Sequence, residues 1–113
     1  MKRILYIPII ISFVFTQQGL KLNDLEPGDS GKLMYPYSGK TFETWPNGDI
    51  KVRGRLRNGL RNGKWEYFHT NGSKMAIGKY FDGDGSDIDP ETKIPRKGFA
   101  GNWIFYYKSG QQW

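Results

Sequence analysis

The chain has 113 residues, the length of one ordinary domain, and a formal net charge of +6. It contains no cysteine, which excludes disulfide bonds, thiolate metal sites, thiol nucleophiles and a lipid-modified N-terminal cysteine. Aromatic residues make up 16% of the chain and glycine contributes 15 residues, whereas runs rich in Ala, Leu and Glu are missing. This composition favours strands and turns over helices.

The N-terminus has the architecture of a secretory signal peptide. Lys2 and Arg3 precede an almost wholly apolar run from 4 to 15, which is followed at once by polar residues. About a dozen apolar residues are too few for a good transmembrane helix, which usually needs about 20. We therefore expect residues 1–16 to be a cleaved signal peptide and the protein to be secreted or periplasmic, with an uncleaved membrane anchor as the alternative.

From residue 38 onward the sequence repeats at a fixed period, after a segment, 17–37, that we expect to form a linker or a partial strand. Glycines recur at an offset of 24, which pairs Gly39, Gly48, Gly54 and Gly59 with Gly63, Gly72, Gly78 and Gly83. A third, partial copy aligns with the second at an offset of 38, which implies an insertion of 14 residues between them. The predicted repeat domain, 38–113, thus holds copies at 38–61, 62–83 and 100–113 and an acidic loop at 84–97.

Within each copy a short aromatic run ends at Asn-Gly or Ser-Gly, and a second extended run follows. Asn-Gly suits a type I′ hairpin turn because both central residues of that turn need a positive φ. The pattern predicts an all-β fold, an open ribbon of successive antiparallel β-hairpins. Its strands are expected at about 41–46, 49–56, 64–69, 74–81 and 102–108.

Alternation along these strands predicts one apolar and one charged face. On the second strand the two opposite sets of side chains are Ile50, Val52 and Leu56 on one side, and Lys51, Arg53 and Arg55 on the other. We expect the aromatic residues of successive copies, Trp65 with Tyr67 and Trp103 with Phe105 and Tyr107, to stack into one buried layer, because an isolated hairpin is marginal in water. The residues that define the repeat are Gly39, Gly48, Gly63, Trp65, Tyr67, Gly72, Gly101, Trp103, Phe105 and Gly110.

Motifs that would carry catalysis or metal binding lack the partners their chemistry needs. The single histidine, His69, occupies the place that Trp45 and Tyr107 hold in the other copies, so we expect it to fill an aromatic position near a turn. The acidic segment from Asp82 to Glu91 fails the spacing of an EF-hand loop, which leaves a solvated loop or an irregular Ca²⁺ site. We predict that the protein is not an enzyme and that it binds no cofactor.

A row of cations is the candidate contact surface. Lys51, Arg53, Arg55 and Arg57 alternate along one predicted strand, with Arg61 and Lys64 close behind, so several cations are expected to share one face of the ribbon. Such a face can meet an acidic protein, an acidic glycan or an anionic lipid surface, and a merely solvated outer face is the alternative. Nucleic acid is the least favoured anion for an exported chain.

Short motifs recur across the copies. They are Tyr37-Ser38-Gly39-Lys40, Trp45-Pro46-Asn47-Gly48, Asn58-Gly59, Asn62-Gly63-Lys64-Trp65-Glu66-Tyr67-Phe68 and Asn71-Gly72, with a weaker return at Gly101-Asn102-Trp103-Ile104-Phe105-Tyr106-Tyr107 and Ser109-Gly110. These motifs resemble the variant MORN repeats of bacterial proteins described as YwqK-type antitoxins. The resemblance implies a ribbon of hairpins without catalytic residues that acts in binding or scaffolding.

We therefore predict a non-catalytic repeat module for protein binding or scaffolding in the cell envelope, with an unidentified protein or envelope component as its partner. Two alternatives stay open. One is peripheral association with an anionic membrane surface through the basic strand face. The other is an antitoxin-like partner role, which would require retention in the cytosol.

Overall fold

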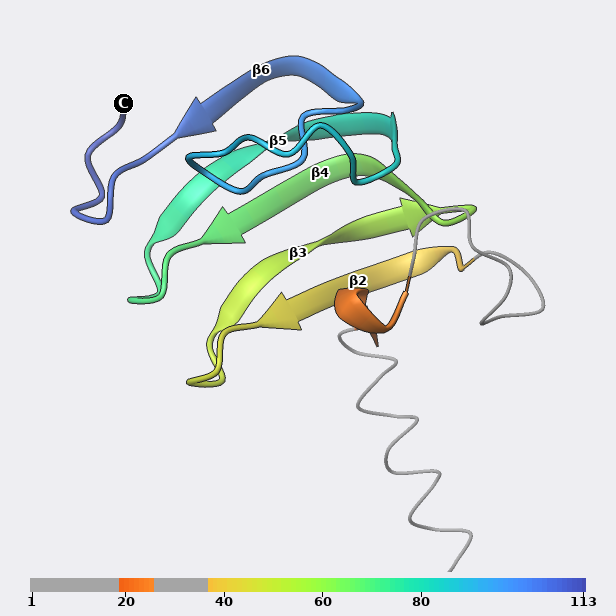
Figure 1. Ribbon diagram of the computed structural model, residues 1–113, viewed down its shortest axis with the longest axis horizontal. Coiled ribbons are helices and arrows are strands. Elements are labelled where there is room, and N and C mark those ends of the chain that lie inside the picture. The colour runs from red at the N-terminus through yellow and green to blue at the C-terminus, as the bar shows by residue number, and fades with distance from the viewer. Residues whose placement is uncertain (1–18, 26–36) are drawn as a thin grey trace, which may run out of the picture.

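The computed structural model describes residues 19–25 and 37–113, which form one six-stranded sheet with its strands side by side in chain order (Figure 1). The first pair of strands is parallel, and every later pair is antiparallel. The predicted all-β ribbon of hairpins is confirmed. The elements are β1 Leu20–Lys21, the 3₁₀ turn η1 Leu22–Asp24, β2 Gly39–Thr44, β3 Ile50–Arg57, β4 Leu60–Phe68, β5 Lys74–Gly83 and β6 Phe99–Phe105.

The N-terminal part of the described chain covers the first strand of the array. Leu20 and Lys21 form β1, which pairs with β2, and Leu22 of η1 is buried in the core. The hydroxyl of Thr41 on β2 donates a hydrogen bond to Leu20 O at 2.7 Å. The predicted signal peptide, 1–16, lies outside the described residues.

A two-residue turn joins β3 to β4. Arg57 pairs directly with Leu60 around Asn58 and Gly59, whose φ values are 53° and 78°. Both are positive, as a type I′ turn requires. Because this turn lets pairing start at once, β4 begins at Leu60 rather than at residue 64 as predicted.

The turns at the other end of the hairpins repeat the same hydrogen bonds at the offsets of 24 and 38. In each turn an N–H donates to the carbonyl four residues on at 2.8 Å, from Trp45 to Asp49, from His69 to Ser73 and from Tyr107 to Gln111. Side chains join one turn to the next, with Asn47 Nδ2 donating to Thr70 O at 3.1 Å and Asn71 Nδ2 to Lys108 O at 3.2 Å. β6 ends at Phe105, before its predicted end at 108, because Tyr107 already belongs to a turn.

A tryptophan lies against a glycine of the neighbouring strand at two places in the sheet. Trp65 is fully buried, and its ring covers Gly54 so closely that a Cβ there would lie 2.1 Å from Trp65 Cδ2. Gly78 and Trp103 repeat this contact at the same 2.1 Å. The indole N–H groups bond to equivalent carbonyls, Trp65 Nε1 to Arg55 O at 3.1 Å and Trp103 Nε1 to Lys79 O at 2.9 Å. Glycine is therefore required on one strand so that the tryptophan of the next can pack on its backbone.

One face of the sheet, which we call the covered face, carries the core. The strands contribute Val52, Leu56, Trp65, Tyr67, Ala76 and Tyr80 to it. Leu22 from η1 and Ile94 from the insertion complete the cluster. Figure 1 shows η1 beside β2 and the insertion beside β5. The predicted aromatic layer stops at Phe105, which is partly buried, because Tyr107 is 53% exposed and pairs with Trp113 outside the core.

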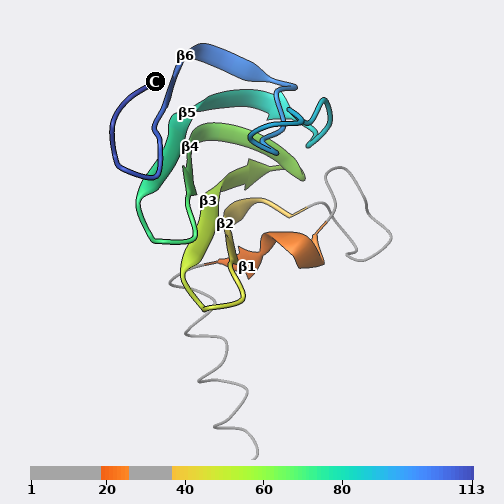
Figure 2. The ribbon, with the colours of Figure 1, turned by 60° about the vertical axis from the view of Figure 1, so that its left-hand side comes forward.

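The insertion at 84–97 folds onto the covered face and is more than the solvated loop expected from its acidic composition (Figure 2). Ile88 and Pro95 form a β-bridge, and Ile94 is only 1% exposed. Tyr80 Oη donates to Pro95 O at 2.6 Å, and burial raises the pKa of this hydroxyl, so it stays protonated as the donor.

Replacing Ile94 by alanine should lower the free energy of unfolding by about 2 to 4 kcal/mol, because a buried aliphatic side chain leaves the core. Ile88→Ala is the matched control within the same insertion. Ile88 is 57% exposed, so its truncation should change stability by less than about 0.5 kcal/mol. Urea unfolding followed by tryptophan fluorescence measures both variants, and equal losses would contradict the packing of the insertion on the core.

Candidate functional site

The four cations predicted as a contact surface lie on β3, and three of them are held by carboxylates of the sheet. Arg53 Nε lies 2.9 Å from Glu66 Oε1, and its guanidinium carbon lies 5.2 Å from the centre of the Phe68 ring. The other two ion pairs join Lys51 to Glu43 and Arg57 to Asp82, both at 3.1 Å. These three cations therefore serve packing between strands and turns.

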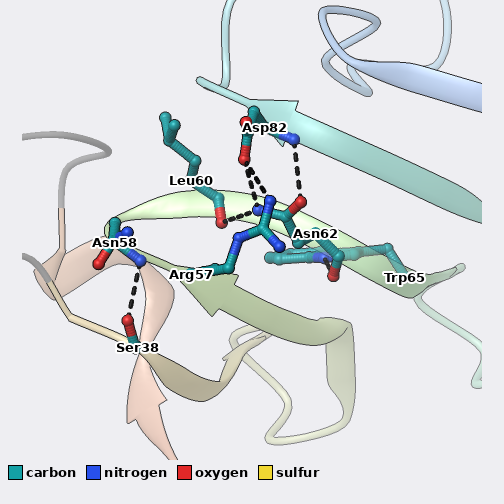
Figure 3. A network of polar contacts seen from close by, with 7 residues as sticks. All are labelled: Ser38, Arg57, Asn58, Leu60, Asn62, Trp65 and Asp82. Atoms are coloured by element: carbon teal, nitrogen blue, oxygen red, sulfur yellow. Dashed lines mark hydrogen bonds and ion pairs between the residues drawn. The ribbon is translucent and has the colours of Figure 1, made fainter.

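Figure 3 shows how the contact of Arg57 ties one turn to the next. Asp82 Oδ1 accepts hydrogen bonds from Asn62 Nδ2 at 3.0 Å and from Arg57 Nη2 at 3.1 Å, and these two donors lower the pKa of Asp82. The backbone N–H of Asp82 returns a bond to Asn62 Oδ1 at 3.1 Å. One repeat earlier, Asn58 N–H bonds to Ser38 Oγ in the same way at 2.8 Å, which makes this network part of the repeat.

Lys51 lies apart from the other three cations because of a register shift. The pairing of β2 with β3 shifts between Glu43 and Thr44. Glu43 pairs with Val52, which is buried on the covered face, and Lys51 forms its ion pair with the Glu43 carboxylate there.

The same register shift changes the face of Ile50. This residue was predicted to point the same way as Val52, but it lines a groove with Arg53 and Arg55 on the opposite side of the sheet. An irregularity of this kind resets the alternation of side chains, which is regular from Val52 to Arg57.

Arg55, the fourth cation, is exposed, and its side chain has no ion-pair or hydrogen-bond partner within 19–25 and 37–113. It lines a groove of about 520 Å³ on the side of the sheet opposite the core, which we call the open face. It also lines a neighbouring groove of about 420 Å³. The first groove contains the cations Lys40, Arg53, Arg55 and Lys64, the carboxylate of Glu66, and the apolar side chains of Phe42 and Ile50.

Cations lie directly opposite one another on neighbouring strands of this face. Lys40 on β2 pairs in register with Arg55 on β3, and Lys64 on β4 pairs with Lys79 on β5. We call these four residues the cationic row. All four are exposed, and none has a carboxylate partner in the described part of the chain. Like charges directly opposite on neighbouring strands destabilise a sheet, so packing does not account for the row.

Glu66 does not neutralise the cationic row, because both of its oxygens are already bound. Oε1 lies 2.9 Å from Arg53 Nε, and Oε2 lies 2.8 Å from Lys74 Nζ. Burial by itself raises the pKa of Glu66, but the hydrogen bonds from Lys74 and Arg53 outweigh it, and the pKa is lowered. The carboxylate is therefore ionised and fully occupied at neutral pH.

Sequence reasoning identified Arg55 and Lys64 but missed Lys40 and Lys79, which lie directly opposite them. A signal for them was present in the repeat itself, because the offset of 24 that relates the glycines also relates Lys40 to Lys64 and Arg55 to Lys79. Their pairing across strands depends on the register of the sheet, which the period alone does not give. The cationic row thus consists of the same two repeat positions, each occupied by a cation, in the first and second copies.

The residues considered for catalysis and metal binding have structural partners. His69 Nε2 lies 2.9 Å from Tyr106 O, which is the position where Trp45 Nε1 bonds to Phe68 O in the preceding copy. Within the described ranges, no group of three or more His, Cys, Asp or Glu side chains is placed to hold a metal ion. In the insertion Arg96 contacts two of the acidic side chains, Asp87 at 3.0 Å and Asp89 at 3.5 Å.

Arg61 is a buried cation on the covered face, where it is 7% exposed. Its guanidinium carbon lies 5.1 Å from the centre of the Trp65 ring and 6.0 Å from that of Tyr80. Nε and Nη1 have no hydrogen-bond partner among the described residues, and the two rings offset part of the cost of burying the charge. The expectation that Arg61 joins the basic face is therefore wrong, because its side chain packs into the core.

Comparison with protein-family models, curated proteins and solved structures finds no match. The resemblance to MORN repeats therefore stays a prediction. No helix among the described residues is long and apolar enough to cross a membrane.

The pH dependence of stability should report the ion pairs of Glu66. Because its folded pKa lies below the ordinary value of 4.5, its contribution is present above pH 4.5 and is lost as the pH falls through the folded pKa. Glu66→Gln should therefore show a flatter fall in unfolding free energy than the wild type as the pH falls below 4.5. Urea unfolding at several pH values checks this.

Glu91→Gln is the control for that series, because it removes the same charge from an exposed site in the insertion. Subtracting its effect corrects for the change in net charge. A Glu66→Gln variant that follows the wild-type curve below pH 4.5 would show that the two ion pairs do not stabilise the sheet.

Proposed function

We propose that the protein is a non-catalytic binding module of the cell envelope that contacts an anionic partner through the open face of its sheet. The cationic row is the observation that supports this most strongly. It concentrates positive potential where folding gains nothing from it, so a binding role accounts for it better than a structural one. The signal peptide and the MORN-type repeats expected from the sequence support the envelope location and the absence of catalysis.

Apolar side chains near the cationic row favour a second candidate, peripheral association with an anionic membrane surface. Phe81 is 66% exposed, and its ring lies 5.7 Å from the guanidinium carbon of Arg57. Ile104 is 37% exposed and pairs in register with Ile77. Exposed apolar groups next to cations suit a surface that rests in the lipid interface.

Co-sedimentation of the purified chain with isolated cell envelopes of its own host tests the proposal. The wild-type chain should pellet at low salt and stay in solution at high salt, because the contact is electrostatic. The row variant Lys40→Gln/Arg55→Gln/Lys64→Gln should stay in solution at both salt concentrations. Lys93→Gln/Lys97→Gln/Lys108→Gln removes the same charge from exposed positions outside the groove and should pellet like the wild type.

Treating the envelopes with protease beforehand separates the two candidates. Loss of pelleting indicates a protein partner, and persistence indicates lipid or glycan. If the wild-type chain stays in solution at low salt, or if the two triple variants behave alike, the open face is not the contact surface.

A further inference from the structure

The strongest unexplained feature of the molecule is that its first two copies each place a pair of cations side by side. Lys40 and Arg55 in the first copy and Lys64 and Lys79 in the second follow the offset of 24, and each pair is directly opposed across neighbouring strands. Within the described residues their side chains have no hydrogen-bond or ion-pair partner. Repetition of an unfavourable pairing indicates a ligand with several negative charges, arranged across the strands.

The groove limits the shape of that ligand. Three members of the cationic row line a groove of about 520 Å³, namely Lys40, Arg55 and Lys64. Because these cations line a groove rather than a flat surface, a thin chain that enters it contacts them better than a bilayer surface does. Ile50 adds an apolar part to the lining, whereas Phe42 is only 8% exposed there.

The length of the cationic row fits a short extended peptide. From β2 to β5 the row crosses three interstrand steps of about 4.8 Å, or roughly 14 Å in all. An extended polypeptide rises about 3.3 Å per residue, so about five residues cover this distance and every second side chain faces the row. Carboxylates at those positions would form charge-assisted hydrogen bonds with the lysines and, through two oxygens at once, with the arginine.

We propose that the cationic row binds an acidic, extended polypeptide segment that carries a carboxylate side chain at every second position. This inference rests on the proposed function and specifies the partner of the same surface. The cations of the row contact the carboxylates, and the side chains between the carboxylates point away from the sheet. Binding neutralises the repulsion within the two opposed pairs, so the segment relieves an unfavourable feature of the free protein.

Fluorescence anisotropy with the full chain and a fluorescein-labelled peptide of alternating Glu and Val tests the inference. The wild-type chain should bind this probe and release it as salt is raised. Lys40→Gln/Arg55→Gln/Lys64→Gln should weaken binding by at least about tenfold, because three charge-assisted contacts are lost. Lys93→Gln/Lys97→Gln/Lys108→Gln, with the same net charge, should stay within about twofold of the wild type, since salt screens distant exposed charges. A matched peptide of Gln and Val should not bind.

Three further probes separate this inference from the proposed function, namely a sulfated polysaccharide, vesicles that contain phosphatidylglycerol, and single-stranded DNA. If the acidic peptide fails and one of these binds in a row-dependent way, the polypeptide inference is overturned and the binding role of the open face survives. If none of the four probes binds, both are overturned. Equal binding of the peptide to the two triple variants also overturns the inference, because binding would then depend on the net charge of the protein and not on the residues that line the groove.

Discussion

The packing of an indole ring on a bare glycine backbone is the interaction on which the rest of this sheet depends. Trp65 on Gly54 and Trp103 on Gly78 fill the covered face, and the register shifts beside both glycines, between Arg53 and Arg55 and between Ile77 and Lys79. Because side chains alternate along a strand, the neighbours of these residues point the other way. Lys64 precedes Trp65, Arg55 follows Gly54 and Lys79 follows Gly78. The cationic row is therefore the outer side of the same layer that forms the core.

The features that sequence reasoning predicted well are those set by local chemistry. Asn58-Gly59 adopts the positive φ values that its residues favour, and the periodic glycines correspond to repeated turns. The features that it missed depend on contacts between distant residues. Ile94 enters the core from a segment whose composition indicates a loop. It is buried because it packs with the aromatic side chains of strands that are distant in the sequence. The face of Lys51 depends on a register shift against β2 that its own strand does not encode.

The charges of β3 show why a row of cations in a sequence is a weak guide to a binding surface. Arg53 and Arg57 alternate as a contact surface would, but each has a carboxylate across the sheet or the turn and an aromatic ring beside it. Only the register distinguishes such cations from Arg55, which lies opposite Lys40. The repeat then produces a second opposed pair of cations, so that the two pairs extend across four neighbouring strands. The proposed binding surface arises from the way the copies are stacked.

If the cationic row serves binding and opposes folding, the row variant should keep its stability when no ligand is present. Urea unfolding at low ionic strength compares Lys40→Gln/Arg55→Gln/Lys64→Gln with the wild type. Relief of like-charge repulsion should leave the variant with an equal or higher midpoint, with a gain of up to about 1 kcal/mol. A midpoint clearly below that of the wild type would mean that these cations stabilise the sheet, which would contradict the account.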